Sequence, residues 1–265
     1  IAKQKKEQPF FAYLAFNSPH YPIVPNKEYH GKSKAGYYGD FVIETDGMVG
    51  KVMQALQEHG FSDNTLVIFS ADNGAETHAF ERLEKFDQWS SGKYRGLKRD
   101  IYEGGHRVPF IVKWPGRVKK GVRSDEVVSQ VDLASTFAKI IDYPLAKTEA
   151  IDSYNLLPVL AGKKYSKPLR VATVQNTSAK KFALRQGDWV LINAPTGAAK
   201  KEQQDYLNHF GLEPYGKENQ GLLFNLKNDP RQSNNLYSQY PSKVKKMRAL
   251  LESYLEGKPC APNKR

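Results

Sequence analysis

The sequence is short of cysteine, of long apolar runs and of glycine-rich loops, and each shortage excludes a class of protein. Its single cysteine, Cys260, has no partner for an internal disulfide and cannot build a zinc site of several cysteines. No apolar stretch approaches the ~20 residues that a membrane-spanning helix needs. There is no glycine-rich phosphate-binding loop, no internal repeat and no low-complexity tract. The composition is that of a globular protein held together by an apolar core.

Positive charge is present in excess, because 40 Lys and Arg oppose 28 Asp and Glu and give a formal net charge of +12. Such an excess is typical of proteins with a polyanionic partner, such as nucleic acid or a sulfated glycan. Here the basic residues are scattered in short groups over the whole chain, as solvated surface lysines usually are. No nucleic-acid-binding motif accompanies them, so we expect neither a nucleic acid nor a membrane as partner.

The apolar pattern of the first half predicts an α/β fold. Residues 10–16 (FFAYLAF) and 65–70 (TLVIFS) are continuous apolar runs, typical of strands buried on both faces. Between them, apolar residues from Phe41 to Leu56 recur at steps of three and four, which predicts an amphipathic helix that ends at Gly60. Strand, helix and strand in this order indicate a parallel pair joined by a right-handed crossover. A third strand is predicted before Pro115 and Gly116.

The second half has another pattern, and we expect a domain boundary between residues 162 and 163. Residues 169–176, 181–194 and 221–226 have the character of strands, with a hairpin turn at Gln186, Gly187 and Asp188. Apolar residues from Val244 to Leu255 predict a C-terminal amphipathic helix. Residues 163–265 are thus predicted to form a smaller α+β subdomain, an antiparallel sheet with one helix laid across it.

Asp72 and Asn73, directly after the strand at 65–70, have two explanations. Asp-Asn-Gly is ordinary turn chemistry, because Asn and Asp tolerate left-handed backbone and Gly takes positive φ freely. Alternatively, the two side chains are ligands at the carboxyl edge of a buried strand, where α/β sheets bind their ligands. A carboxylate beside a carboxamide offers hard oxygen donors, which suit Ca²⁺ or Mg²⁺ and not zinc.

Four blocks of sequence, in this order, resemble the second half of a type I sulfatase, a member of the alkaline phosphatase superfamily. They are FFAYLAFNSPHYP (10–22), TLVIFSADNG (65–74), YRGLKRDIYEGGHRVPFIVKWPG (94–116) and VVSQVDLASTF (127–137). The resemblance covers Pro9 to Gly162 and continues through GDWVLI (187–192) and residues 222–236. It implies that residues 1–162 are the C-terminal part of the catalytic domain, with an alkaline-phosphatase-like sheet and flanking helices.

Carried over residue by residue, the resemblance implies roles for four side chains. Asp72 and Asn73 correspond to two ligands of the divalent cation, usually Ca²⁺, with Mg²⁺ as the alternative. His20, in Ser-Pro-His, corresponds to a histidine that contacts the sulfate and is implicated in protonating the leaving group. Lys98 corresponds to a lysine that binds a sulfate oxygen. His20 and Lys98 are therefore our candidate catalytic and substrate-binding residues.

The sequence departs from the family pattern in two respects. Leu97 and Arg99 flank the candidate lysine at positions where members often have glycine. The Asp-Asp metal pair, the motif whose Cys or Ser becomes formylglycine, and the Lys-x-His pair are not found in residues 1–265. From the resemblance we expect all three, formylglycine included, in an N-terminal half of the same enzyme, and we expect residues 1–265 to be inactive without it.

Other interpretations stay open beside the sulfatase. Taken singly, His20 is an ordinary loop histidine and Lys98 belongs to a solvated basic patch. A phosphodiesterase or phosphonate hydrolase of the same superfamily uses related metal ligands, and a noncatalytic polyanion-binding module would use the basic surface. For a sulfatase, the resemblance implies a sulfate ester, such as a sulfated glycan, as substrate and a periplasmic or secreted location.

Overall fold

The computed structural model describes residues 1–163, 168–177, 180–259 and 261, and it divides the chain into two compact units. The first unit consists of Ile1–Ile68, His78–Trp89 and Val112–Gly116. The second consists of Phe69–Thr77, Ser90–Ile111 and Arg117–Arg265. The second unit thus takes residues from both sides of the predicted boundary at 162, and that boundary stays a prediction.

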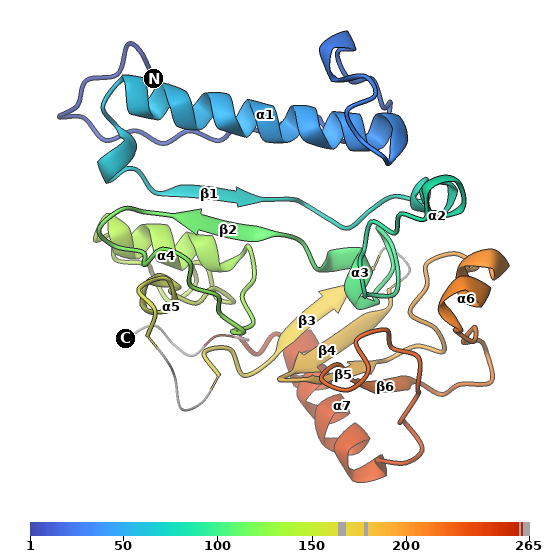
Figure 1. Ribbon diagram of the computed structural model, residues 1–265. Coiled ribbons are helices and arrows are strands. Elements are labelled where there is room, and N and C mark those ends of the chain that lie inside the picture. Colours follow the sequence, from blue (N-terminus) through green and yellow to red (C-terminus); the bar gives the residue numbers. More distant parts are fainter. Residues whose placement is uncertain (164–167, 178–179, 260, 262–265) are drawn as a thin grey trace. The chain divides into compact units, whose positions relative to one another are not determined.

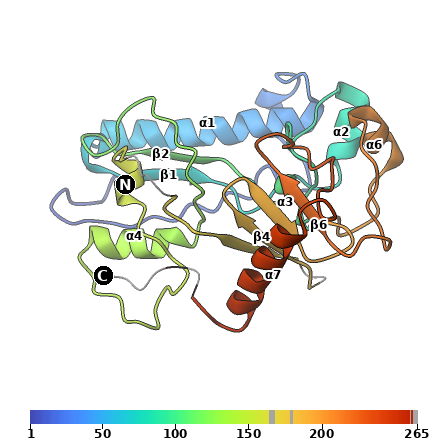
Figure 2. The same ribbon diagram turned by 90° about the horizontal axis from the view of Figure 1, so that it is seen from below.

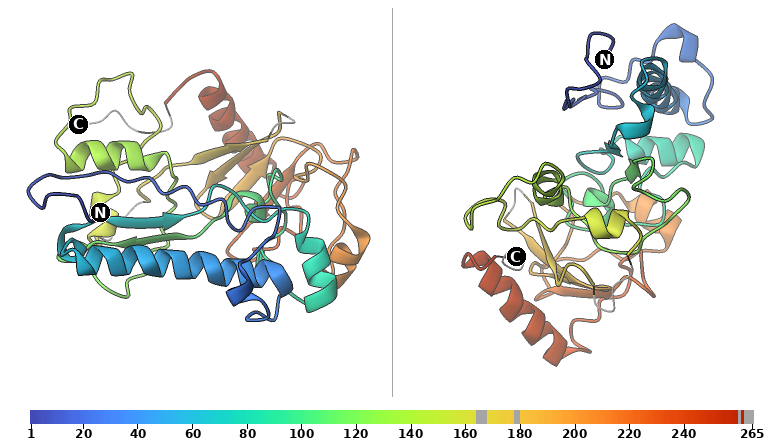
Figure 3. Two further views of the ribbon diagram at one scale, coloured as in Figure 1. Left: turned by 90° about the horizontal axis from the view of Figure 1, so that it is seen from above. Right: turned by 90° about the vertical axis from the view of Figure 1, so that its left-hand side faces the viewer.

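The first unit is built on one long helix, α1 (Gly36–Glu58), with an extended N-terminal segment alongside it (Figures 1 and 3). This confirms the predicted amphipathic helix, and Gly60 follows its end with a φ of +71°. The buried carboxylate of Asp40 fixes the loop before the helix by accepting hydrogen bonds from the backbone N–H groups of Gly31 (2.8 Å) and Ser33 (2.7 Å). The helix therefore organises the turn that precedes it.

Three short helices complete the first unit: two 3-10 turns, Lys27–Tyr29 and Ser62–Asn64, and α2 (Ala79–Phe86). The guanidinium of Arg82 lies 3.7 Å from the centroid of the Tyr38 ring. This cation–π contact attaches α2 to α1.

The predicted strand at residues 10–16 is not formed. The segment is irregular, and the side chains of Phe11, Tyr13 and Leu14 are exposed by 76, 83 and 54%. A strand buried on both faces needs neighbouring strands for its backbone hydrogen bonds and other elements to cover its side chains. No strand among the described residues pairs with this segment, so the predicted parallel pair with residues 65–70 is wrong as well.

Two strands predicted from the first half are confirmed, β1 (Val67–Ser70) and β2 (Phe110–Lys113), and they form a two-stranded sheet. Short helices follow in the second unit: α3 (Glu103–His106), α4 (Asp132–Ile140) and α5 (Leu157–Leu160). None of the helices described here has the length and apolar character needed to cross a membrane.

The predicted antiparallel sheet and its helix are confirmed in the second unit (Figures 1 and 2). The strands pair in chain order: β3 (Thr173–Asn176), β4 (Phe182–Gln186), β5 (Trp189–Ile192) and β6 (Leu222–Asn225). Helix α6 (Gln204–Phe210) lies between β5 and β6 in the sequence, and α7 (Pro241–Leu255) follows β6. The predicted hairpin joins β4 to β5 and uses Gly187 at a φ of +59°.

Successive side chains of a strand point to opposite faces of the sheet. Here both faces are buried, and each belongs to a separate apolar cluster. On one face, Leu184, Leu191 and Leu223 pack against α7. On the other face, a second cluster contains Ile101 and Tyr102 from the loop that follows the candidate lysine, together with Ala183, Val190, Ile192, Leu222 and Phe224. The C-terminal sheet is therefore the support on which the loop of residues 94–106 rests.

Candidate active site

Asp72 and Asn73 follow β1 after one intervening residue, and hydrogen bonds fix the end of the strand. The Ser70 hydroxyl donates to the carbonyl oxygen of Pro109 (2.9 Å) and accepts from the Gln130 amide (3.0 Å). Residues 70, 109 and 130 belong to three of the four sequence blocks that resemble a sulfatase. These blocks therefore meet at the strand end that carries the two candidate ligands.

Gly74 is required by space and not by its backbone angles. A Cβ added there would lie 1.9 Å from the carbonyl oxygen of Gly104, and the Gly74 N–H donates to the Gly105 carbonyl (3.0 Å). Asp72, Asn73 and Gly74 are not among the residues with positive φ. The left-handed turn that offers the ordinary explanation of this tripeptide is therefore not observed; the glycine allows two backbone segments to touch.

Lys98 lies beside this segment, because its backbone N–H donates to the carbonyl of Ala75 at 2.7 Å. One residue further, the Arg99 guanidinium donates to both carboxylate oxygens of Glu76, at 2.9 and 2.8 Å. The hydrogen bonds from Arg99 lower the pKa of Glu76 to about 2, and the nearby charge of Lys98 acts in the same direction. The segment of residues 72–76 is therefore joined by backbone and side-chain contacts to residues 94–106, which we call the lysine loop.

Arg99 has a φ of +77°, a left-handed conformation that favours glycine. This explains why glycine is common at the position in the family that the sequence resembles. In this chain, Nη1 of Arg99 donates to both oxygens of Glu76, an ion pair that glycine could not make. Leu97, the other departure from the family pattern, is buried at 3% exposure beside the loop backbone.

His20 belongs to the first unit, whereas the other three candidates belong to the second. It is exposed in a turn whose Ser18 hydroxyl accepts a hydrogen bond from Thr45 of α1 (2.7 Å). Its Nδ1 lies 2.7 Å from the carbonyl oxygen of Tyr21 and must donate, because a carbonyl oxygen only accepts. The contact therefore keeps a proton on Nδ1.

The side-chain oxygens of Asp72 and Asn73 are of the type that a hard cation prefers, but two residues supply too few of them. Asp72 is exposed, and no donor among the described residues hydrogen-bonds its carboxylate. The Asn73 amide N–H donates to the Gly74 carbonyl (2.9 Å), so its oxygen stays available. Ca²⁺ takes about six to eight oxygens. The described part of the chain contains no group of three or more His, Cys, Asp or Glu that could hold a metal ion.

No pattern in the sequence indicated a role for Arg95, which lies in a stretch rich in basic residues between Lys93 and Arg99. The residue is only 1% exposed, and its side chain forms an ion pair with Glu202. The two residues are 107 positions apart. No local pattern could have linked them.

Comparison with known proteins gives a consistent result. The model of the sulfatase family, described as "Sulfatase", matches residues 1–143. The N-acetylgalactosamine-6-O-sulfatase of Bacteroides thetaiotaomicron is 34% identical over 254 residues, which are 94% of this chain and 47% of that protein. Human steryl-sulfatase is 35% identical over 161 residues, 61% of this chain and 28% of that protein. The chain thus spans about half, or less, of the length of these relatives.

Solved structures agree. One from Bacteroides thetaiotaomicron, from work on the metabolism of multiple glycosaminoglycans, is 34% identical with a TM-score of 0.76, covering 94% of this chain and 50% of that one. A second, Ps i-CgsB in complex with a neocarrahexaose, has a TM-score of 0.74 at 24% identity, covers 98% of this chain and 53% of that one, and shows the fold alone. The predicted α/β fold of the alkaline phosphatase type is confirmed.

Proposed function

Because the chain belongs to the sulfatase family, we propose that the whole protein hydrolyses a sulfate ester. The observation that carries this proposal within the chain is the junction of the lysine loop with the segment of residues 72–76. There the Lys98 N–H bonds to Ala75, and Gly74 touches the Gly104–Gly105 backbone. Lys98 and the two candidate ligands, Asp72 and Asn73, thus belong to one unit.

In the proposed reaction, Lys98 stabilises negative charge and His20 donates a proton. The Lys98 ammonium acts as a point charge with rotatable donors on a sulfate oxygen, where negative charge accumulates. The imidazole of His20, whose Nδ1 donates to the Tyr21 carbonyl, gives a proton to the leaving oxygen, as the family resemblance implies. Neither residue serves as the nucleophile, for which the family resemblance implies formylglycine outside residues 1–265.

Asp72 and Asn73 would hold the divalent cation, Ca²⁺ or, as the alternative, Mg²⁺. The carboxylate of Asp72 and the amide oxygen of Asn73 contribute two of the oxygens it requires. When bound, such a cation polarises the sulfate oxygens. The rest of this part of the chain keeps the two ligands in place, through Ser70, Gln130 and the close approach at Gly74.

For the substrate we propose a sulfated glycan, encountered in the periplasm or outside the cell. The support is the relative named N-acetylgalactosamine-6-O-sulfatase, whose similarity extends over 94% of this chain. Human steryl-sulfatase matches a shorter part, 61% of this chain. The second unit's C-terminal sheet is therefore included in the similarity to a glycan sulfatase.

Replacement of the two candidate residues tests the proposal. In the whole protein, produced with formylglycine-generating activity, Lys98→Ala and His20→Ala should each lower kcat by about a hundredfold or more, the scale for an acid–base group or an anion-stabilising donor. Release of inorganic sulfate from 6-O-sulfated N-acetylgalactosamine is the measurement. Lys93→Ala, at an exposed position five residues before Lys98, is the matched control and should keep wild-type kcat.

Wild-type activity in both variants would mean that His20 and Lys98 are ordinary loop and surface residues. A higher kcat/KM toward a phosphate diester than toward the sulfated sugar would instead favour the phosphodiesterase interpretation. Heparin binding without any turnover, abolished by neutralising surface lysines, would favour a polyanion-binding module.

A further inference from the structure

Arg95 stands three residues before Lys98 and is fully engaged inside the second unit. Its Nε and Nη2 donate to the two carboxylate oxygens of Glu202, at 2.7 and 2.6 Å. Nη2 also donates to the Glu213 carbonyl (2.9 Å), and Nη1 donates to the Gln232 carbonyl (3.3 Å). A bidentate pair with additional acceptors is the arrangement that compensates a buried guanidinium for its lost hydration.

Two tyrosine rings enclose the same guanidinium. Its Cζ lies 4.7 Å from the ring centroid of Tyr102 and 4.9 Å from that of Tyr215. Burial raises the pKa of each phenol to about 12, so both rings stay neutral at physiological pH. Arg95 is therefore fixed from several directions by side chains and carbonyls, all within one unit.

The segment of residues 196–202, which carries the carboxylate partner, is attached to the lysine loop at two further points. The Ala199 N–H donates to Asp100 Oδ1 at 2.7 Å. The Ile101 N–H donates to the Gly197 carbonyl at 2.8 Å. One segment therefore binds the lysine loop both before and after Lys98.

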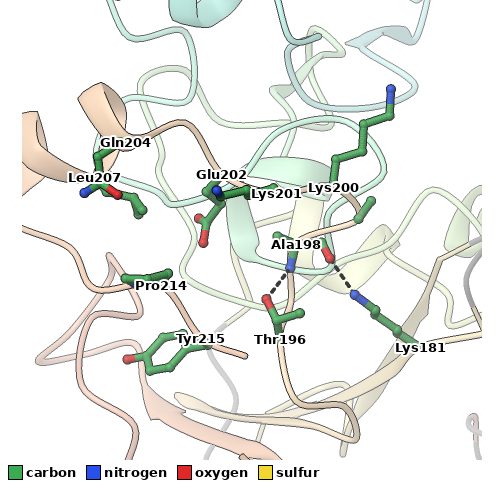
Figure 4. Close-up of a pocket in the computed structure, with 11 residues that line it drawn as sticks. Lys181, Thr196, Ala198, Lys200, Lys201, Glu202, Gln204, Leu207, Pro214 and Tyr215 are labelled. Atoms are coloured by element: carbon green, nitrogen blue, oxygen red, sulfur yellow. Dashed lines mark hydrogen bonds between the residues drawn. The ribbon is translucent and has the colours of Figure 1, made fainter. Parts of the chain in front are cut away.

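The shape of this segment is itself set by hydrogen bonds, shown as dashed lines in Figure 4. The Ala198 N–H donates to the Thr196 hydroxyl (3.2 Å), and the Lys181 ammonium donates to the Ala198 carbonyl. Figure 4 also shows a pocket with a volume of about 300 Å³, and Glu202 is one of the residues that line it. Glutamine has the same shape as this glutamate, so it fits at the position.

Between the anchors, the lysine loop has little freedom. Gly96 has a φ of +92°, and a Cβ there would lie 2.8 Å from Cβ of Tyr102. The Leu97 N–H donates to Asp100 Oδ2 (2.8 Å). A displacement of Arg95 is therefore transmitted to Lys98 through two constrained residues, Gly96 and Leu97.

We propose that Arg95 and Glu202 are positioning residues that fix Lys98 against the segment of residues 72–76. This inference rests on the role proposed above for Lys98 in sulfate-ester hydrolysis. A displacement of about 1 Å by a change remote from the chemistry can lower a rate on the order of a hundredfold. The C-terminal sheet thus contributes to the reaction through the lysine loop.

A double-mutant cycle with Lys98 tests the inference in the whole protein. Glu202→Gln keeps the shape of the side chain and removes its charge, and Arg95→Lys keeps a charge and loses the planar fork. Each should lower kcat by about tenfold or more, with KM changed by less than about threefold. In a Lys98→Ala background the same replacements should lower kcat no further, because their effect passes through the lysine.

A readout independent of turnover accompanies the kinetics. The Lys98 amide, bonded to the Ala75 carbonyl, should exchange its hydrogen faster in Glu202→Gln than in the wild type. Val244→Ala removes apolar atoms from α7, on the face of the sheet opposite the lysine loop, and is the control for a remote core change that should keep both kcat and the Lys98 exchange rate. If Arg95→Lys does not fold, Glu202→Gln alone completes the cycle.

Unchanged kcat in Glu202→Gln, or an equal loss of kcat in both backgrounds, would overturn the positioning role. Wild-type kcat in Lys98→Ala would be a different result, since it would overturn the proposed function and this inference with it.

Discussion

At the scale of single residues, Arg99 shows how a side chain compensates an unfavourable backbone. Left-handed backbone costs a residue other than glycine about 1–2 kcal/mol. The ion pair with Glu76 offsets part of this free energy. The side chain of Arg99 is 48% exposed and that of Glu76 is 29% exposed. Solvent screening therefore limits the contribution of the pair to about 1 kcal/mol.

The same pair predicts a pH dependence of stability. Because Arg99 lowers the pKa of Glu76 from 4.5 to about 2, the stabilisation is present above pH 4.5 and is lost as the pH falls toward 2. Arg99→Gly removes the pair and keeps a favourable backbone. The difference in unfolding free energy between wild type and Arg99→Gly, measured with urea, should therefore shift by about 1 kcal/mol between pH 6 and pH 2, to the disadvantage of the wild type. A difference independent of pH would contradict this origin of the pKa shift.

At the scale of elements, the contact between the segment that follows β1 and the start of α3 depends on glycine. A Cβ at Gly74 would overlap the Gly104 carbonyl oxygen, a backbone atom that cannot rotate away. The lysine loop and the segment of residues 72–76 can touch only because both are free of side chains here.

Gly74→Ala should consequently destabilise the protein by about 1–3 kcal/mol or more, the usual cost of inserting atoms into a packed site. Gly50→Ala is the matched control, because a Cβ there meets no atom within 4 Å inside helix α1. That replacement should be neutral or stabilising by about 0.5–1 kcal/mol. Chemical denaturation of both variants is the measurement, and equal stability would refute the close approach at Gly74.

Local sequence patterns predicted the elements that pack against other elements of this chain. Helix α1, strands β1 and β2, and the antiparallel sheet with α7 all follow from apolar periodicity and turn residues. Residues 10–16 have an equally apolar pattern and form no strand, because a strand also needs neighbours that the pattern does not specify. In the candidate site, the resemblance identified Lys98, but Arg95 and Glu202 are joined only by tertiary structure.

At the scale of the whole molecule, the incomplete ligand set predicts the behaviour of residues 1–265 alone. Asp72 and Asn73 offer two oxygens and one negative charge, whereas Ca²⁺ takes about six to eight oxygens. A polypeptide of these residues should therefore bind Ca²⁺ weakly or not at all by calorimetry, and Asp72→Asn should remove any heat that remains. Submicromolar affinity would show that this chain completes a metal site unaided.

The discontinuous second unit has a consequence for protein synthesis. Arg95 is translated 107 residues before Glu202, which carries its counter-charge. At a translation rate of about 5–20 residues per second, the interval between the two is about 5–20 s. During that interval the guanidinium has no carboxylate to enter the interior with. The nascent lysine loop must therefore stay hydrated until the C-terminal strands have been translated.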